Sequence, residues 1–139
     1  MSGRVPSLFD NNEKISLFPT LARTTTANGN SHDRIGEHGK AMALIDSAVG
    51  TGTTPTLDVS FEDSDDDTTF AAVAAALVGP VVQITDGGAS FQAVELDLDG
   101  MRRFIRAVAT IAGTTPSFTF SVSLVAAPRE RAGGAAQVA

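Results

Sequence analysis

The sequence predicts an all-β protein, an antiparallel β-sandwich of jelly-roll-like type with an extended N-terminal arm. From Lys40 onward the chain is a series of short apolar runs separated by Gly, Pro, Asp and Thr, a pattern typical of sandwiches and barrels. Several runs alternate apolar and polar residues, as half-buried strands do. The 139 residues suit one domain, with expected boundaries at 1–39 for the arm, 40–128 for the sandwich and 129–139 for a flexible C-terminal tail.

The N-terminal 39 residues contain two Leu-Phe pairs, followed by a run rich in Thr, Asn and Gly. Neither helical nor strand periodicity persists there. The segment is therefore expected to be an extended arm that becomes ordered by docking on another surface, with Phe9, Phe18 and Leu21 as its anchors. The alternative is an unstructured terminus whose apolar residues occur by chance.

The remaining apolar runs define the expected strands. In TLDVSFED, residues 56–63, the three large apolar side chains fall on one face and polar side chains on the other. The same alternation occurs in residues 91–98 and in residues 117–125. Residues 102–112 are apolar on both faces in their second half, as expected for a strand in the middle of a sheet. The full set of expected strands is 41–49, 56–63, 81–85, 91–98, 102–112 and 117–125.

Residues 70–79, FAAVAAALVG, are the exception to the strand pattern. The five alanines favour a helical turn by propensity. A connection of mixed character is the equally supported alternative.

The sequence Gly-Thr-Thr-Pro occurs twice, at residues 52–55 and 113–116, each time just ahead of an expected strand. Proline suits that position because it fixes φ and lacks a donor where the ladder has not begun. The repeat indicates either equivalent corners in two stacked sheets or one useful turn that arose twice.

The stretch SFEDSDDDTTF, residues 60–70, places five carboxylates within six residues. If Asp63 began an EF-hand-type calcium loop, Asp65 and Asp67 would fill positions three and five, but positions six and twelve hold Thr and Ala instead of Gly and Glu. A polar turn is favoured because Ser64 and Asp65 can hydrogen-bond backbone groups two residues on. A non-standard cation site at Asp63, Asp65 and Asp67 is the alternative.

Composition excludes several classes of function. The net charge of −6 opposes nucleic-acid binding driven by phosphate contacts. The chain has no cysteine, and its two histidines, His32 and His38, fall in the expected arm with no motif linking them to a serine nucleophile. No secretory signal and no apolar span of about eighteen residues is found. The chain is therefore expected to be a soluble, cytoplasmically made protein without catalytic activity.

Charge is segregated along the sequence. Residues 58–99 contain ten acidic residues and no basic one, whereas residues 101–131 contain five arginines and one glutamate. Such segregation suits contact between copies of the chain; the alternative is that strands adjacent in the fold pair their outward charges. Alternation places Arg102 and Arg106 on one face, where they either pair with the acids ending the 91–98 strand or reach an acidic partner.

Three segments of the chain resemble a known family. A Ser-x-Asp-x-x-x-Phe turn is matched by Ser64, Asp66 and Phe70. An arginine-aromatic-x-arginine strand is matched by residues 103–106, and a Gly-x-x-Pro-Ser corner by residues 113–117. The chain is in these respects similar to the head decoration, or cement, proteins that tailed bacteriophages encode beside the major capsid protein.

The resemblance covers roughly residues 40–129 and implies a function. It implies a non-enzymatic virion structural protein that binds the outer surface of a bacteriophage head and stabilises it through the N-terminal arm and contacts between copies. The implied partners are the major capsid protein and the chain itself, as a homotrimer or another homo-oligomer, without nucleic acid, membrane or cofactor. The implied location is the capsid exterior, after assembly in the host cytoplasm. The alternative is a phage tail, neck or host-adhesion module, with carbohydrate or calcium as candidate ligand.

The resemblance also assigns contact residues. The residues expected to touch the capsid are Phe9, Phe18, Leu21 and Arg23. The residues expected to form contacts between copies are Asp63, Asp65, Asp66, Asp67, Arg102 and Arg106.

Overall fold

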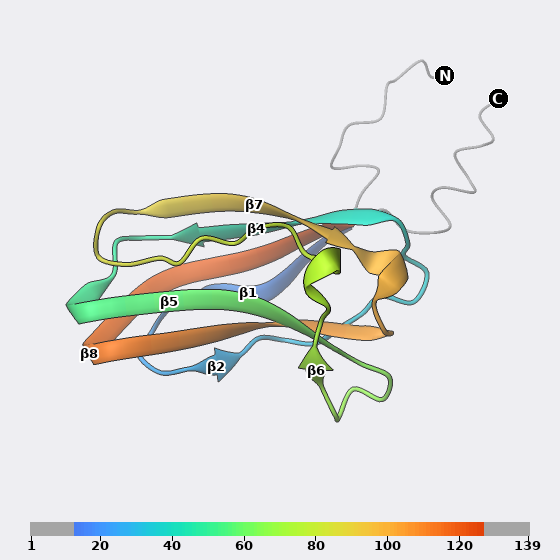
Figure 1. Ribbon diagram of the computed structural model, residues 1–139, viewed down its shortest axis with the longest axis horizontal. Coiled ribbons are helices and arrows are strands. Elements are labelled where there is room, and N and C mark those ends of the chain that lie inside the picture. The colour runs from blue at the N-terminus through green and yellow to red at the C-terminus, as the bar shows by residue number, and fades with distance from the viewer. Residues whose placement is uncertain (1–12, 127–139) are drawn as a thin grey trace, which may run out of the picture.

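The computed structural model describes residues 13–126 and contains eight β-strands and two short 3₁₀ helices in that range (Figure 1). The strands are β1 (Glu13–Arg23), β2 (Ala27–Asn28), β3 (His32–Asp33), β4 (Lys40–Ser47), β5 (Thr51–Ser64), β6 (Ala71–Ala72), β7 (Ser90–Asp97) and β8 (Phe104–Ala126). The helices are η1 (Ala75–Leu77) and η2 (Leu98–Gly100). Neither helix is long and apolar enough to cross a membrane.

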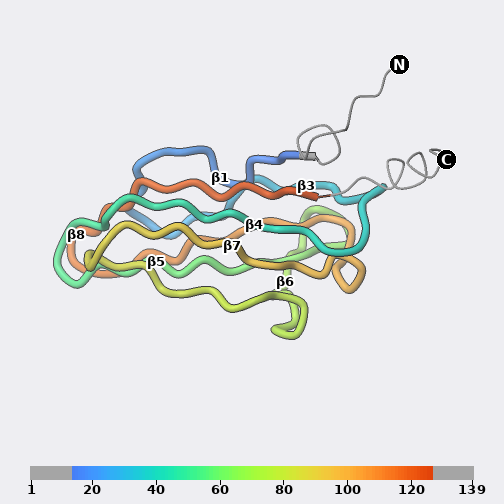
Figure 2. The backbone as a smooth tube through the Cα atoms, turned by 90° about the horizontal axis from the view of Figure 1, so that it is seen from above, coloured from blue at the N-terminus to red at the C-terminus, as the bar shows by residue number. Residues whose placement is uncertain are grey.

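The strands form one curled antiparallel sheet whose two layers lie face to face. The upper layer in Figure 1 contains β1, the second half of β8, β4 and β7, in that order. The lower layer contains β2 and β3, the first half of β8, β5 and β6. Figure 2, seen from above, shows the upper-layer strands side by side. The predicted fold class, an all-β antiparallel sandwich, is confirmed.

β8 is a single strand of 23 residues, and it belongs to both layers. Its first half pairs with β5, and its second half pairs with β4 and β1. The two predicted strands 102–112 and 117–125 correspond to these halves. The chain between them stays extended because β5 accompanies it from one layer to the other.

The two Gly-Thr-Thr-Pro sequences lie opposite each other where the ribbon formed by β5 and β8 bends. Thr53 pairs with Thr114, so the 52–55 corner of β5 faces the 113–116 corner of β8. Their backbones match: the glycines have φ of 116° and 121°, and the second threonines have φ of 46° and 47°. The repeat therefore marks equivalent corners, which are paired within one ribbon instead of being placed in separate sheets.

Close backbone approach at the paired corner requires both glycines. A Cβ atom at Gly52 would lie 2.6 Å from the carbonyl oxygen of Thr115, and one at Gly113 would lie 2.8 Å from that of Thr54. Both positive φ values also lie in a region that side chains disfavour. Two register shifts between β5 and β8 at this point absorb the bend, as β-bulges do.

The inner faces of the two layers form one apolar core. The predicted inward residues Leu57, Val59 and Phe61 are buried, and so are Val94, Leu96 and Leu98, the residues predicted to face inward in the 91–98 segment. This burial confirms the alternation read from the sequence for both segments. The largest fully buried side chains are Phe118, Phe120, Leu17, Ile45, Leu57, Leu96, Leu98, Ile105, Leu124, Val94, Val122 and Pro55.

The prediction of an extended arm over residues 1–39 is wrong for residues 13–39. β1 pairs antiparallel with β8 along its whole length, and β2 and β3 pair with the first half of β8. Leu17 and Phe18 are buried, and the Phe18 ring lies 5.2 Å from the Phe120 ring, centroid to centroid. Two register shifts in β1 interrupt its alternation, so no strand period is visible in the sequence. Residues 1–12 and the predicted tail 129–139 lie outside the described residues.

Residues 73–84 cover the open side of the sandwich between β5 and β7. The Gly79 N–H donates to the Glu95 carbonyl oxygen on β7 at 2.8 Å. Farther along, Ile84 exchanges two backbone hydrogen bonds with Leu57 on β5, of 3.0 and 2.8 Å. The segment thus ties the edges of the two layers together.

The structure settles the two alternatives for residues 70–79 in favour of a mixed connection, which contains β6 and the single 3₁₀ turn η1. The prediction of a strand at 81–85 is wrong, because only Ile84 forms a bridge there. The segment gives its hydrogen bonds to two different strands, so it does not form a continuous ladder with either.

Alanine substitution at either corner glycine tests the paired corner. We expect Gly52→Ala and Gly113→Ala each to destabilise the fold by about 2 kcal/mol or more, because both combine a strained φ with a backbone clash. Urea unfolding of the two variants measures the cost. Gly88→Ala is the matched control, since nothing lies within 4 Å of its Cβ position. Equal unfolding midpoints for all three variants would contradict the account.

Candidate functional site

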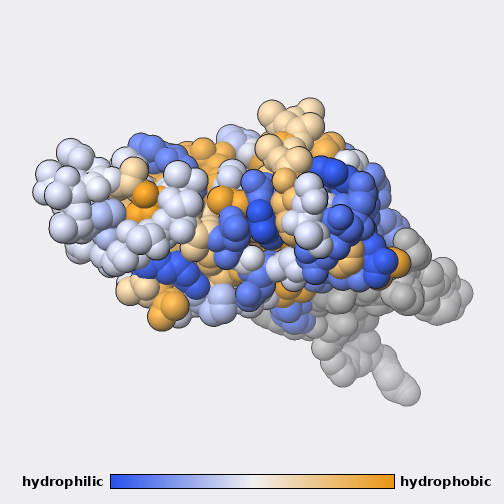
Figure 3. All heavy atoms as spheres, turned by 90° about the horizontal axis from the view of Figure 1, so that it is seen from below, coloured by the Kyte–Doolittle hydropathy of each residue, from blue (hydrophilic) through white to orange (hydrophobic). Residues whose placement is uncertain are grey.

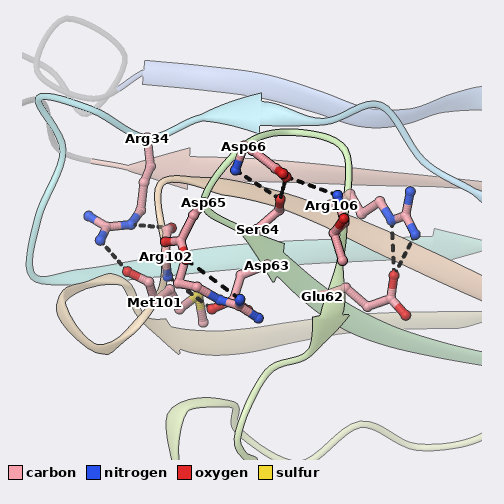
Figure 4. Close-up of polar contacts among 10 residues, drawn as sticks. Arg34, Glu62, Asp63, Ser64, Asp65, Asp66, Met101, Arg102 and Arg106 are labelled. Carbon is pink, nitrogen blue, oxygen red and sulfur yellow. Dashed lines mark hydrogen bonds and ion pairs between the residues drawn. The ribbon is translucent and has the colours of Figure 1, made fainter.

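The acidic stretch forms a turn closed by the Asp66 carboxylate. Oδ1 of Asp66 accepts a hydrogen bond from the Ser64 hydroxyl at 2.8 Å (Figure 4). It also accepts hydrogen bonds from the backbone N–H groups of Thr68 and Thr69, both at 2.9 Å. Asp67 takes a left-handed conformation, with φ of 62°. The N–H groups of Thr69 and Thr68 and the Ser64 hydroxyl lower the pKa of Asp66 to about 2. The predicted polar turn is present, with Asp66 as its central acceptor.

The base of the turn is fixed to the start of β8 by an ion pair. The buried Asp63 carboxylate accepts from the backbone N–H of Arg102 at 2.9 Å and from its Nε at 3.1 Å, and Nη2 lies 3.0 Å from Oδ1. Asp65 approaches the same guanidinium at 3.8 Å. Arg34 donates to the carbonyl oxygens of Met101 and Arg102, the latter at 2.8 Å, which fixes this segment from the other side.

Arg106 forms a second ion pair, with the β5 carboxylate that precedes Asp63 by one residue. The Arg106 guanidinium donates to Oε1 of Glu62, its cross-strand partner, at 2.9 and 2.7 Å. The same guanidinium lies 4.0 Å from the centroid of the Phe70 ring. Phe70, at the far end of the turn, is thereby held against the outer face of the lower layer.

Two further pairs involve the N-terminal segment: the first joins it to the residue just before β8, and the second lies within the segment. Arg103 donates to both carboxylate oxygens of Asp33, at 2.9 and 2.7 Å, which lowers the pKa of that carboxyl. Nε2 of His32, whose strand pairs with β8 at Ile105, lies 2.8 Å from the buried carboxylate of Glu37. Sequence reasoning missed these pairs because their residues lie in a segment without periodicity.

Several residues predicted to form contacts between copies are instead engaged within their own chain. Asp63 is buried, and Arg102 and Arg106 bind carboxylates of their own chain. Of the two interpretations of the charge pattern, the structure favours pairing within the fold, although the partners lie on β5 instead of at the end of β7. Contact between copies through the exposed Asp65, Asp66 and Asp67 stays a prediction. Figure 3 shows hydrophilic residues gathered over this end of the lower face.

The cation-site alternative required Asp63, Asp65 and Asp67 to converge. Instead the Asp63 carboxylate faces Arg102, and within residues 13–126 no group of three or more His, Cys, Asp and Glu side chains is placed to hold a metal ion. The Asp63 carboxylate is thus engaged by a guanidinium of its own chain.

The predicted capsid-contact residues are divided between core and surface. Phe18 is a core residue, and the Arg23 guanidinium lies 4.8 Å from its ring centroid while donating to the Pro19 carbonyl oxygen at 3.0 Å. Leu21 is 59% exposed on β1. Phe9 lies outside the described residues. Only Leu21 is thus an exposed apolar contact candidate among the three described residues.

Comparison with known proteins identifies similar folds. No protein-family model and no curated protein matches the sequence. A chain from infectious bursal disease virus Gx strain matches with a TM-score of 0.51 and 15% identity, over 85% of this chain and 32% of that one, so this chain spans about a third of it. The VP2 subviral particle of the same virus gives 0.47 and 15%, covering 89% and 34%. The SPBc2 prophage-derived protein YomS gives 0.45 and 16%, covering 82% and 94%. The first similarity supports the sandwich fold.

Removing the Arg102 side chain tests whether it acts within one chain. We expect Arg102→Ala to destabilise the fold by about 1–2 kcal/mol, because it leaves the buried Asp63 carboxylate with fewer donors. Arg103→Ala, whose partner Asp33 is exposed, should cost less than about 1 kcal/mol in the same chemical denaturation. If Arg102→Ala instead changes the oligomeric state in sedimentation and leaves stability unaltered, the residue acts between copies.

Acid titration tests the closure of the turn. Since the pKa of Asp66 is lowered from 3.8 to about 2, the unfolded chain binds more protons than the folded chain between these values. The contribution of Asp66 to stability is therefore complete above pH about 4 and is lost as the pH falls through about 2. We expect the carboxyl ¹³C resonance of Asp66 to titrate with a midpoint near 2. A midpoint near 3.8 would show that the hydrogen bonds do not form in solution.

Proposed function

We propose that the chain is a non-enzymatic structural protein of a virus particle and, more specifically, a decoration protein on the outer surface of a bacteriophage head. The observation that carries the proposal is the position of the three family-like segments. All three lie on the ribbon formed by β5 and β8 or on the turn that follows β5. The segments that resemble the phage decoration proteins thus belong to one part of the fold.

Each matched residue has a structural part in that ribbon. Ser64 and Asp66 close the turn, and Phe70 lies under the Arg106 guanidinium. Gly113 permits the close approach of the two corners. These residues maintain a surface shape and perform no bond-breaking chemistry, which is what a protein that reinforces a shell requires.

The use of charged side chains supports a structural role. The carboxylates of Asp63, Glu62 and Asp33 are each engaged by an arginine of β8 or of the segment just before it. Buried and partly buried charges are thereby committed to holding elements together. The fold similarity to a chain from infectious bursal disease virus agrees with a role in a virus particle.

Binding to the head would proceed through an edge of the sandwich and through contacts between copies. β1 is the last strand of the upper layer within the described residues, and Leu21 is its exposed apolar side chain. Residues 1–12, with Phe9, precede this edge in the sequence and lie outside the described residues. A protein that binds the assembled shell and not the free subunits stabilises the shell by linkage. The proposed partners are the major capsid protein and further copies of this chain.

Electron cryomicroscopy of intact particles of the phage that encodes this protein tests the proposal. We expect density that fits residues 13–126 on the outside of the head, bound to assembled capsid subunits. Density confined to the tail or neck would favour the module of the alternative interpretation. Particles that lack the protein altogether would contradict any virion role.

A charged substitution on β1 tests the proposed capsid edge. We expect Leu21→Asp to weaken binding to heads that lack the protein by about tenfold or more, because a charge would replace an apolar contact. Co-sedimentation with purified heads gives the binding curve. Val82→Asp is the control, since Val82 is 67% exposed on the opposite side, next to β7. Equal binding by both variants, with unchanged melting temperatures, would rule out this edge.

A further inference from the structure

The outer face of the upper layer carries a shallow, open cavity near the end where β4 leads towards β5. Its volume is about 310 Å³, at the lower end of the range for small-molecule sites. The side chains of Thr20, Asp46, Thr119 and Ser121 line it together with small residues. These four residues come from β1, β4 and β8, so no sequence motif joins them.

One row of side chains crosses the outer face at this cavity. Asp46 is the cross-strand partner of Ser121 on β8 and of Phe91 on β7. Directly paired residues of an antiparallel sheet have Cβ atoms about 5 Å apart. The Phe91 side chain, which is 67% exposed, therefore lies beside Asp46 on the side of β7, next to the residues that line the cavity. Within residues 13–126 the Asp46 carboxylate has neither a hydrogen-bond donor nor an ion-pair partner.

A β-bulge brings the fourth polar residue to the cavity. The register of β1 shifts between Phe18 and Leu21, so Pro19 and Thr20 stand opposite the single residue Ser121. Bulges re-aim side chains in this way and are frequent beside binding sites. Arg23 stabilises the bulge. Its guanidinium donates to the Pro19 carbonyl oxygen and stacks on the rings of Phe18 and Phe120.

The donor and acceptor content of the cavity limits what it can bind. Each hydroxyl donates one hydrogen bond and accepts two, and the carboxylate accepts only. An anion would be repelled by Asp46, and Ca²⁺ prefers six to eight oxygens with several carboxylates, whereas the cavity offers one. A neutral polyol supplies hydroxyl donors to the carboxylate and can both donate to and accept from the hydroxyls.

We infer that this cavity binds a neutral saccharide unit. Sugar hydroxyls donate to the Asp46 carboxylate and exchange hydrogen bonds with Thr119 and Ser121. The C–H face of the ring lies against Phe91, whose π-face is electron-rich. This binding goes beyond the proposed structural role and does not depend on it.

Titration of the full chain with simple sugars, followed by ¹H–¹⁵N NMR, tests the inference. The probes are methyl α-D-glucopyranoside, methyl β-D-galactopyranoside and N-acetyl-D-glucosamine. We expect at least one to give saturable shifts at the backbone amides of Asp46, Thr119 and Ser121, with a dissociation constant of about 1–10 mM. Asp46→Ala should abolish these shifts, and Phe91→Ala should raise the dissociation constant about fivefold.

Matched variants and competing probes decide the outcome. Val82→Ala is the control for Phe91→Ala, because both side chains are 67% exposed, and it should leave the dissociation constant unchanged. The same spectra report whether each variant is folded. The inference is overturned if no probe gives saturable shifts, if the shifts persist in Asp46→Ala, or if the same amides respond only to calcium chloride or to an oligolysine peptide. Those last responses would identify a cation site or a contact for a basic protein segment.

Discussion

The fold depends on one constraint: two long strands must bend together while they stay paired. β8 serves both layers, and β5 accompanies it around the corner, so neither layer can form without the other. The bend is possible because Gly52 and Gly113 take matching positive φ values and let the two backbones approach closely. The positions of β1, β4 and the acidic turn, which are all attached to the ribbon, therefore depend on this corner.

At the other end of the ribbon, ion pairs hold β5 and the start of β8 together. There Asp63 binds Arg102 and Glu62 binds Arg106, which fixes the turn and the start of β8 to each other. The turn itself is closed by hydrogen bonds to Asp66. The acidic stretch that suggested a metal site is therefore the polar end of a strand pair. In the function proposed above, a sandwich whose polar groups are engaged in this way reinforces a larger assembly, and the β1 edge of its upper layer contacts the partners.

The sequence predicted the fold class and the strands whose alternation is regular, such as 57–61 and 94–98, because burial of one face imposes a period of two. It failed at β1, where bulges and Pro19 interrupt that period although Leu17 and Phe18 are core residues. It also left open whether Arg102 and Arg106 pair with the acids that end the 91–98 strand or reach an acidic partner, whereas in the structure they pair with acids of β5. β7 precedes these arginines in sequence, but β7 pairs with β4, and the neighbour of β8 at that end is β5. Register and layer order arise from long-range pairing, which local pattern does not encode. The saccharide cavity was not predictable from the sequence for the same reason, because long-range pairing of three strands brings its residues together.

Native-state hydrogen exchange along β8 tests most directly whether the shared strand makes the two layers one cooperative unit. The account predicts that the slowest amides of the lower-layer half, around residues 105–111, and those of the upper-layer half, around residues 118–124, open with the same free energy as global unfolding, within about 1 kcal/mol. A lower-layer half that opens at a clearly smaller free energy, while the upper-layer half stays protected, would contradict it.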